Sequence, residues 1–121
     1  KVMAVTDAGF VNSYDYPGIG LHDELALYVK YGLTPSQALA SATRAGPAWF
    51  GEMDRYGSIA QGKVADLVLL DRNPLQSIAA TRAIRMVVVH GNAYDRAALD
   101  AMLAATRTKV AEWNAAPKRS E

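Results

Sequence analysis

The chain has 121 residues, half of them apolar, and a formal net charge of +1, which is the makeup of one soluble globular domain. Its near-balanced, scattered charges leave no electrostatic footprint for nucleic acid. No apolar run approaches the roughly 20 residues that span a bilayer, and the absence of cysteine excludes disulfides, cysteine-bound zinc and a thiol nucleophile. The compartment stays open: the cytoplasm is favoured, and secretion would need a signal peptide upstream.

The first expected element is a buried strand at Val2–Val5, which leads into Thr6–Gly9 without any preceding turn or cap. A parallel strand inside a sheet needs neighbours on both sides. We therefore expect this chain to be the carboxyl-terminal piece of a longer protein. The next segment, Phe10–Gly20, is rich in Gly, Pro, Tyr and Asp and has no sustained period, so it is expected to be a loop.

Three helical segments are expected next. Apolar residues at helical spacing, followed by a glycine suited to end a helix, predict a helix over about His22–Tyr31. A threonine N-cap followed by proline predicts a second helix over about Thr34–Thr43. Gly46–Pro47 then restarts the chain as a short helical turn that carries Trp49 and Phe50.

The period changes to that of short strands from Gly57 onward. Strands are expected at Ser58–Ile59, Ala65–Leu70 and Ile84–Val89, and the hairpin signal is Gly91–Asn92. The second of these strands is a continuous apolar run, which is typical of a strand covered on both faces. The second half of the chain is therefore expected to form a small sheet.

A long helix is expected after Asp95, which is suited to be its N-cap. Five residues form one apolar stripe on this helix: Leu99, Met102, Leu103, Val110 and Trp113. In the isolated chain we expect exposed apolar surface along this stripe and at Val2–Val5, because their expected neighbours are missing.

The segment Gly57–Leu75 joins two glycine turns to one short apolar strand. Its run Gly62–Val68, reading Gly-Lys-Val-Ala-Asp-Leu-Val, resembles the signature near the carboxyl end of metal-dependent amidohydrolases. The resemblance is strongest to the imidazolonepropionase-like and Xaa-Pro-dipeptidase-like branch. It implies an α/β fold in which the last strand and helices of a TIM-type (β/α)8 barrel precede the carboxyl-terminal strands of a small β-sandwich domain and a terminal helix. It also implies hydrolysis of amide and related C–N bonds.

The resemblance divides the chain into four parts. Residues 1–56 would be the end of the hydrolase barrel, and residues 57–95 would supply strands to the small β-sandwich, or composite, domain. Residues 96–116 would form the terminal helix, and residues 117–121 a tail. The partner implied first is the missing amino-terminal part of the barrel.

Asp7 stands directly after the first expected strand, which in a barrel places it at the carboxyl-terminal rim, where active sites collect. The resemblance implies that this carboxylate binds a divalent metal, zinc above all, and accepts a proton from metal-bound water. The other reading of Asp7 is a cap of the following turn. The family's remaining ligands, a His-x-His pair, a carboxylated Lys or Glu and two further His, are missing here, and His22 and His90 lack ligand spacing. The chain alone is therefore expected to be inert.

Four residues are candidates for substrate binding: Asn12, Tyr14, Tyr16 and His22. The first three lie in the loop expected to border the pocket, where amide and aromatic groups could orient a substrate, and packing or turn roles are the alternative. In the signature, Lys63 is expected to be solvated and Asp66 to satisfy local backbone donors.

Three functions remain open. The first is part of a metal-dependent amidohydrolase that acts on a small-molecule amide, cyclic amide or dipeptide. The second is a noncatalytic assembly module, and the third is a small-molecule binding domain. Neither nucleic acid nor a membrane is expected as a partner, and the oligomeric state, including a homo-oligomer, stays open.

Overall fold

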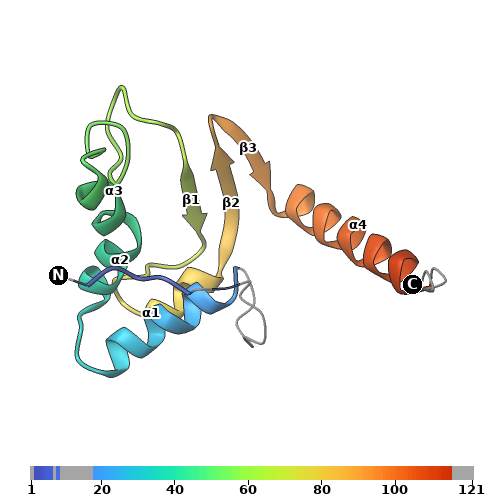
Figure 1. Cartoon of the computed structure of the whole chain (residues 1–121), viewed down its shortest axis with the longest axis horizontal. Helices are drawn as coiled ribbons and strands as arrows, with labels where there is room; N and C mark the ends of the chain where they lie inside the picture. Colours follow the sequence, from blue (N-terminus) through green and yellow to red (C-terminus); the bar gives the residue numbers. More distant parts are fainter. Residues whose placement is uncertain (1, 7, 9–17, 116–121) are drawn as a thin grey trace, which may run out of the picture.

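The computed structural model describes residues 2–6, 8 and 18–115. The elements, in chain order, are α1 (Gly20–Lys30), α2 (Pro35–Thr43), α3 (Ala45–Phe50), β1 (Leu67–Leu70), the 3₁₀ helix η1 (Ile78–Arg82), β2 (Ile84–Val89), β3 (Asn92–Asp95) and α4 (Arg96–Ala115). In the view of Figure 1, α2 and α3 lie to one side of β1 and β2, α1 and η1 lie below these strands, and α4 extends away on the other side. The α/β class is confirmed, with one small sheet in the described part.

Helices α1 and α2 form where local signals predict them. α1 begins two residues before the predicted start and ends ahead of Gly32, whose φ of 110° is the left-handed conformation that suits glycine. α2 has a complete capping box: the Thr34 hydroxyl accepts the Gln37 N–H at 3.2 Å, and the Thr34 N–H donates to Gln37 Oε1 at 2.8 Å. Both helices are therefore specified by residues within one turn of their ends.

The sheet is antiparallel, in the order β1-β2-β3. Leu67 lies opposite Val88, and a bulge interrupts the β1–β2 register between Leu69 and Leu70. The prediction for β2 is confirmed, whereas β1 begins later than Ala65. The middle of β1 is exposed in this chain, so the expectation of a strand covered on both faces is wrong for the described residues.

Two expected strands do not form. Ser58–Ile59 lies in a turn region and Ile59 is fully outside the core. Val2–Val5 has no strand beside it in the described part, and a strand needs such a partner for its backbone hydrogen bonds. Instead the segment runs across the helices, where the Ala4 N–H donates to the Ser41 carbonyl at 3.1 Å.

The hairpin turn is shifted by one residue from the predicted Gly91–Asn92. Val89 and Asn92 are the last pair of β2 and β3, so the two loop residues are His90 and Gly91, with φ of 48° and 81°. Positive φ at both positions is the condition for the tight turn that matches strand twist. The Asp66 carboxylate holds this turn by accepting the His90 N–H at 2.7 Å.

The core is small and lies where α1, α2 and η1 meet. Its buried residues are Leu25, Ala38 and Ile78. Ala38 is completely covered, because its single methyl group lets α2 approach α1 closely. This cluster, and not the sheet, fixes how α1 sits on the rest of the chain.

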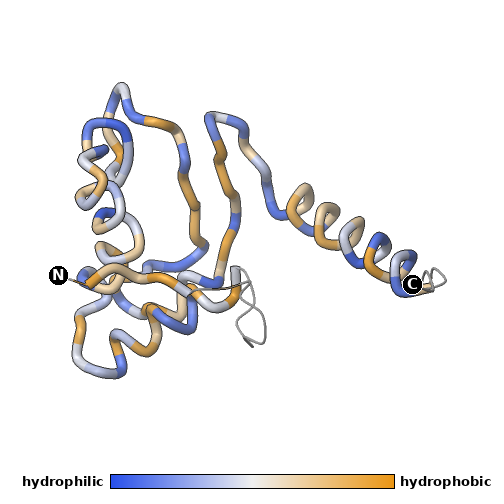
Figure 2. Tube along the Cα trace, in the orientation of Figure 1, coloured by the Kyte–Doolittle hydropathy of each residue, from blue (hydrophilic) through white to orange (hydrophobic). Residues whose placement is uncertain are grey.

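α4 has the opposite character, since none of its residues is buried. Its Asp95 cap is confirmed by the Ala98 N–H, which donates to Asp95 Oδ1 at 2.8 Å. Apolar residues recur along the projecting helix (Figure 2), and Met102, Leu103, Val110 and Trp113 are all exposed. The expected exposure is therefore confirmed for these four residues of the stripe and for Val2, Met3 and Val5, whereas Leu99 is half-buried. Within the described residues, no helix has both the length and the apolar character that crossing a membrane requires.

Candidate functional site

Most of the predicted site lies outside the described residues. Asp7, Asn12, Tyr14 and Tyr16 belong to this group, so their roles stay predictions. His22 lies in the first turn of α1 and is half-buried. The site can therefore be built from His22 and from the described residues on either side of Asp7.

The residues that flank Asp7 lie beside the start of α1. The Ala8 N–H donates to the Thr6 hydroxyl at 3.3 Å. A Cβ added to Gly20 would come within 3.3 Å of Thr6 Cγ2, so the Thr6 side chain packs directly on this glycine. Because Gly20 begins α1, the chain next to position 7 lies close to the helix turn that carries His22.

Two hydrogen bonds fix the segment before Asp7 on the helices. The Ala4 amide bonds to the end of α2, as described above, and the Tyr28 hydroxyl donates to the Met3 carbonyl at 3.4 Å. The Glu24 side chain is a second acceptor for this hydroxyl and raises the pKa of Tyr28 above its ordinary value, so the single phenol proton is shared between Glu24 and the Met3 carbonyl. The helices thus cover this segment on one side.

His22 is held by a residue far away in the sequence. Its Nδ1 lies 3.1 Å from the hydroxyl oxygen of Thr81 in η1, and the neighbouring Asp23 forms an exposed ion pair with Arg82. Burial, and then the positive charge of Arg82, lower the pKa of His22 below its usual 6.5, against the opposing effect of Asp23. The imidazole is therefore neutral at physiological pH.

No described group of three His, Asp or Glu side chains comes together in a way that could hold a metal ion. His22 lies on α1, whereas His90 lies in the β2–β3 turn with an exposed side chain, 3.9 Å from Asp66. As expected from their spacing, the two histidines belong to separate parts of the fold. The described residues alone do not fit a zinc site, which needs three or four converging ligands.

An open groove of about 820 Å³ lies along the amino-terminal segment, α2 and α3. Its lining includes Val2, Met3, Ala48 and Trp49, and is apolar apart from Gln37, Ser41 and Arg44. His22 does not line it. The groove is thus a largely apolar face whose lining does not include His22.

The signature around Lys63 has a structural role, but not the one expected. The Lys63 ammonium donates to the carbonyl of Met53 and, at 3.3 Å, to that of Tyr56, so the expectation of a solvated lysine is wrong. Asp66 bonds to His90, 24 residues away, and not to local donors. Gly57, with φ of 82°, packs against the end of α2, where a Cβ would come within 3.3 Å of the Thr43 carbonyl. The signature thus binds the helices to the sheet.

Sequence reasoning missed Thr81 and Arg82 altogether. Each contacts a residue 59 positions earlier in the chain, Thr81 with His22 and Arg82 with Asp23. Neither residue belongs to a motif or a periodic pattern, so the sequence holds no local signal that could have found them.

Comparison with known proteins gives this geometry a context. The model of the amidohydrolase family matches residues 1–94. No curated protein matches the chain. Three solved structures are similar to it. A molinate hydrolase has 30% sequence identity and a TM-score of 0.64, and the match covers 66% of this chain and 17% of the hydrolase. A Xaa-Pro dipeptidase with bound methionine has 30% identity and a TM-score of 0.58, with 61% of this chain and 18% of the dipeptidase covered, and phenylurea hydrolase B has 37% identity and a TM-score of 0.59, with 64% of this chain and 17% of that hydrolase covered.

The chain spans less than a fifth of the length of these three structures. The matched region of the family model ends within β3, so α4 lies beyond it. The match to the amidohydrolase family model covers more than three quarters of the chain, and it includes both Asp7 and the signature around Lys63. This chain therefore belongs to the amidohydrolase family.

Proposed function

We propose that this chain is the carboxyl-terminal part of a metal-dependent amidohydrolase that hydrolyses C–N bonds in a small-molecule amide, cyclic amide or dipeptide. The observation that carries the proposal is the single continuous family match over residues 1–94. Two of the similar structures are named as a Xaa-Pro dipeptidase and a phenylurea hydrolase, and both names describe hydrolases that act on carbon–nitrogen bonds.

Within this function, Asp7 is the residue of the chain that holds the divalent metal, for which zinc is the best candidate. The metal, when bound, supplies a water acidified to a pKa of about 7. Asp7 would help to hold this metal, and its carboxylate would be the group of this chain that carries a proton toward the leaving nitrogen. Asn12, Tyr14 and Tyr16 orient the substrate from the segment that follows.

The described geometry supports a barrel origin for residues 1–56. Val2–Val5 is an apolar segment covered by helices on one side and exposed on the other, which is the environment of a barrel strand whose neighbours are missing. The remaining ligands would then come from preceding strands. In the same proposal, residues 57–95 complete a small β-sandwich, which explains why the middle of β1 is exposed here.

A noncatalytic module for assembly or small-molecule binding is the second candidate. The apolar groove of about 820 Å³ and the uncovered α4 favour it, because such surfaces are typical of contact sites. It differs from the first proposal in one measurable way: it needs no carboxylate at position 7.

The experiment compares Asp7→Asn with Asp54→Asn in the protein that carries the complete reading frame. Asp54 is exposed in the loop after α3, so its variant controls for the loss of one surface charge. Turnover is measured on an amide, a cyclic amide and a Xaa-Pro dipeptide, before and after chelation and after zinc is restored. We expect Asp7→Asn to lower kcat by about 100-fold or more while the fold is kept, and Asp54→Asn to leave it unchanged.

The 121-residue chain by itself should show no turnover with or without zinc. Near-normal kcat in Asp7→Asn would refute the role of Asp7. Metal-dependent turnover by the 121-residue chain would refute the proposal that its site is incomplete.

A further inference from the structure

The Thr81 hydroxyl joins two groups that cannot both accept its single proton. Its oxygen lies 2.8 Å from the carbonyl oxygen of Ile78 and 3.1 Å from Nδ1 of His22. A carbonyl oxygen has no proton to donate, so the short contact with Ile78 requires the hydroxyl proton to point there. The hydroxyl oxygen must then accept a proton at its contact with His22, which makes Nδ1 the donor.

We propose that Thr81 fixes His22 in the Nδ1–H tautomer, so that Nε2 presents its lone pair to an N–H or O–H group of the substrate. Thr81 is then a positioning residue that acts through His22, and His22 is the binding group. The tautomer follows from the geometry alone, whereas the contact with substrate rests on the function proposed above.

The neighbouring contacts hold the imidazole in this state. Thr81 is buried, so its oxygen has little access to water as an alternative partner. The next residue of each element, Asp23 of α1 and Arg82 of η1, forms an ion pair. Two consecutive contacts thus join the first turn of α1 to the end of η1, and His22 cannot turn away without breaking the bond to Thr81.

The charges around His22 keep Nε2 unprotonated. Arg82 from η1 and Asp23 from α1 are the charged groups that affect it, and burial together with Arg82 outweighs Asp23, so the pKa lies below its usual value. The lone pair therefore remains free across the neutral pH range, as an acceptor requires.

The position of His22 connects it with the predicted site. Gly20 begins α1 two residues before His22 and is in contact with Thr6, which immediately precedes Asp7. The helix turn that carries His22 therefore lies beside the end of the segment that precedes the proposed metal ligand. The acceptor chemistry of Nε2 suits an N–H group beside a scissile C–N bond.

The first test is spectroscopic and needs no turnover. Two-bond ¹⁵N–¹H correlations of the ¹⁵N-labelled chain at neutral pH identify the tautomer of each imidazole. We expect Nδ1–H to predominate at His22, while the exposed His90 shows the Nε2–H majority usual for free histidine. Thr81→Ser keeps the hydroxyl and should keep the tautomer.

Thr81→Val, which has nearly the same shape without the hydroxyl, should lower the Nδ1–H to Nε2–H ratio at His22 by about tenfold, the effect of losing one hydrogen bond. An Nε2–H majority at His22 in the unsubstituted chain, whatever its cause, overturns the proposal. An unchanged ratio in Thr81→Val overturns it as well.

The second test uses the complete hydrolase and a pair of substrates, one with an N–H beside the scissile bond and its N-methylated analogue. Thr81→Val should raise KM about tenfold for the N–H substrate, with little change in kcat, and leave KM for the analogue unchanged. Equal KM changes for both substrates refute the contact with Nε2. Absence of any turnover in the unsubstituted protein refutes the proposed function, while the tautomer is still decided by the spectroscopic test.

Discussion

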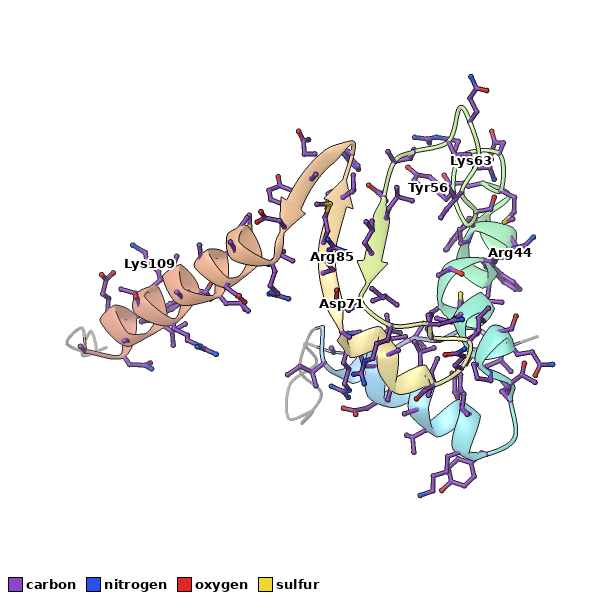
Figure 3. All side chains as sticks on the ribbon, turned by 180° about the vertical axis from the view of Figure 1, so that it is seen from behind. Arg44, Tyr56, Lys63, Asp71, Arg85 and Lys109 are labelled. Atoms are coloured by element: carbon purple, nitrogen blue, oxygen red, sulfur yellow. The ribbon has the colours of Figure 1, made fainter. Side chains whose placement is uncertain are left out.

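Replacing Lys63 by methionine should loosen the turn that joins α3 to the sheet. The Lys63 ammonium donates to the carbonyls of Met53 and Tyr56, and Lys63 and Tyr56 lie near each other at this end of the molecule (Figure 3). The same loop is closed by the Val64 N–H, which donates to the Arg55 carbonyl at 3.0 Å. Methionine keeps most of the apolar side chain but has no donor, so only the two ammonium bonds are lost.

The magnitude follows from these two bonds. A hydrogen bond to a charged group contributes about 1.5–3 kcal/mol. The two bonds share one partly buried ammonium, so their contributions are not additive. Their joint loss should therefore destabilise the loop by about 2 kcal/mol, which corresponds to an increase of about 30-fold in the opening equilibrium.

Hydrogen exchange of the Val64 amide measures this opening directly, since exchange reports local as well as global unfolding. We expect the protection factor of Val64 to fall about 30-fold in Lys63→Met. The control is Lys109→Met on α4, where the lysine is exposed and lies 3.7 Å from Glu112, because such surface pairs contribute about 0.5 kcal/mol or less. A Val64 protection factor unchanged within about twofold, or an equal loss in the control, would refute the structural role of Lys63.

Two further predictions concern the histidines. The pKa of His22 is lower in the folded chain than the unfolded value of 6.5, so the unfolded state binds more protons and the free energy of unfolding should decline as the pH falls below 6.5. Thermal melts from pH 7.5 to 5 should show this decline, and His22→Gln should reduce it; an equal decline in both proteins would contradict the cause. His90→Asn places a residue that tolerates positive φ before Gly91, at the position where histidine has a φ of 48°. It should raise stability by about 0.5–1 kcal/mol, and a melting midpoint no higher than that of the unsubstituted chain would show that the turn is not strained.

Sequence patterns were most reliable where the cause is local. The Thr34–Gln37 capping box and the glycine after α1 specify their helices within one turn. The β2 strand, Ile84–Val89, has the predicted bounds. The run Gly62–Val68 predicted the family, which the match over residues 1–94 confirms.

Predictions failed where an element depends on a neighbour. Val2–Val5 is apolar enough for a strand, but without an adjacent strand in the described part it has no ladder to join. The sequence predicts a solvated Lys63, because nothing in its pattern indicates that the chain brings two backbone carbonyls to its ammonium. Of the candidate site residues only His22 lies in the described part, and the roles of Asp7, Asn12, Tyr14 and Tyr16 stay predictions.

The sequence by itself determined the family, the class and the helices, because capping, periodicity and a short motif act over a few residues. The tertiary structure decided which atoms meet: Asp66 with the amide of His90, Asp23 with Arg82, and His22 with Thr81. These contacts join residues 24 to 59 positions apart, and their geometry depends on how α1, α2 and η1 pack around Leu25 and Ala38. The tertiary structure also decides the tautomer of His22, because this tautomer depends on the Thr81 hydroxyl, which only the packed fold brings within hydrogen-bonding distance.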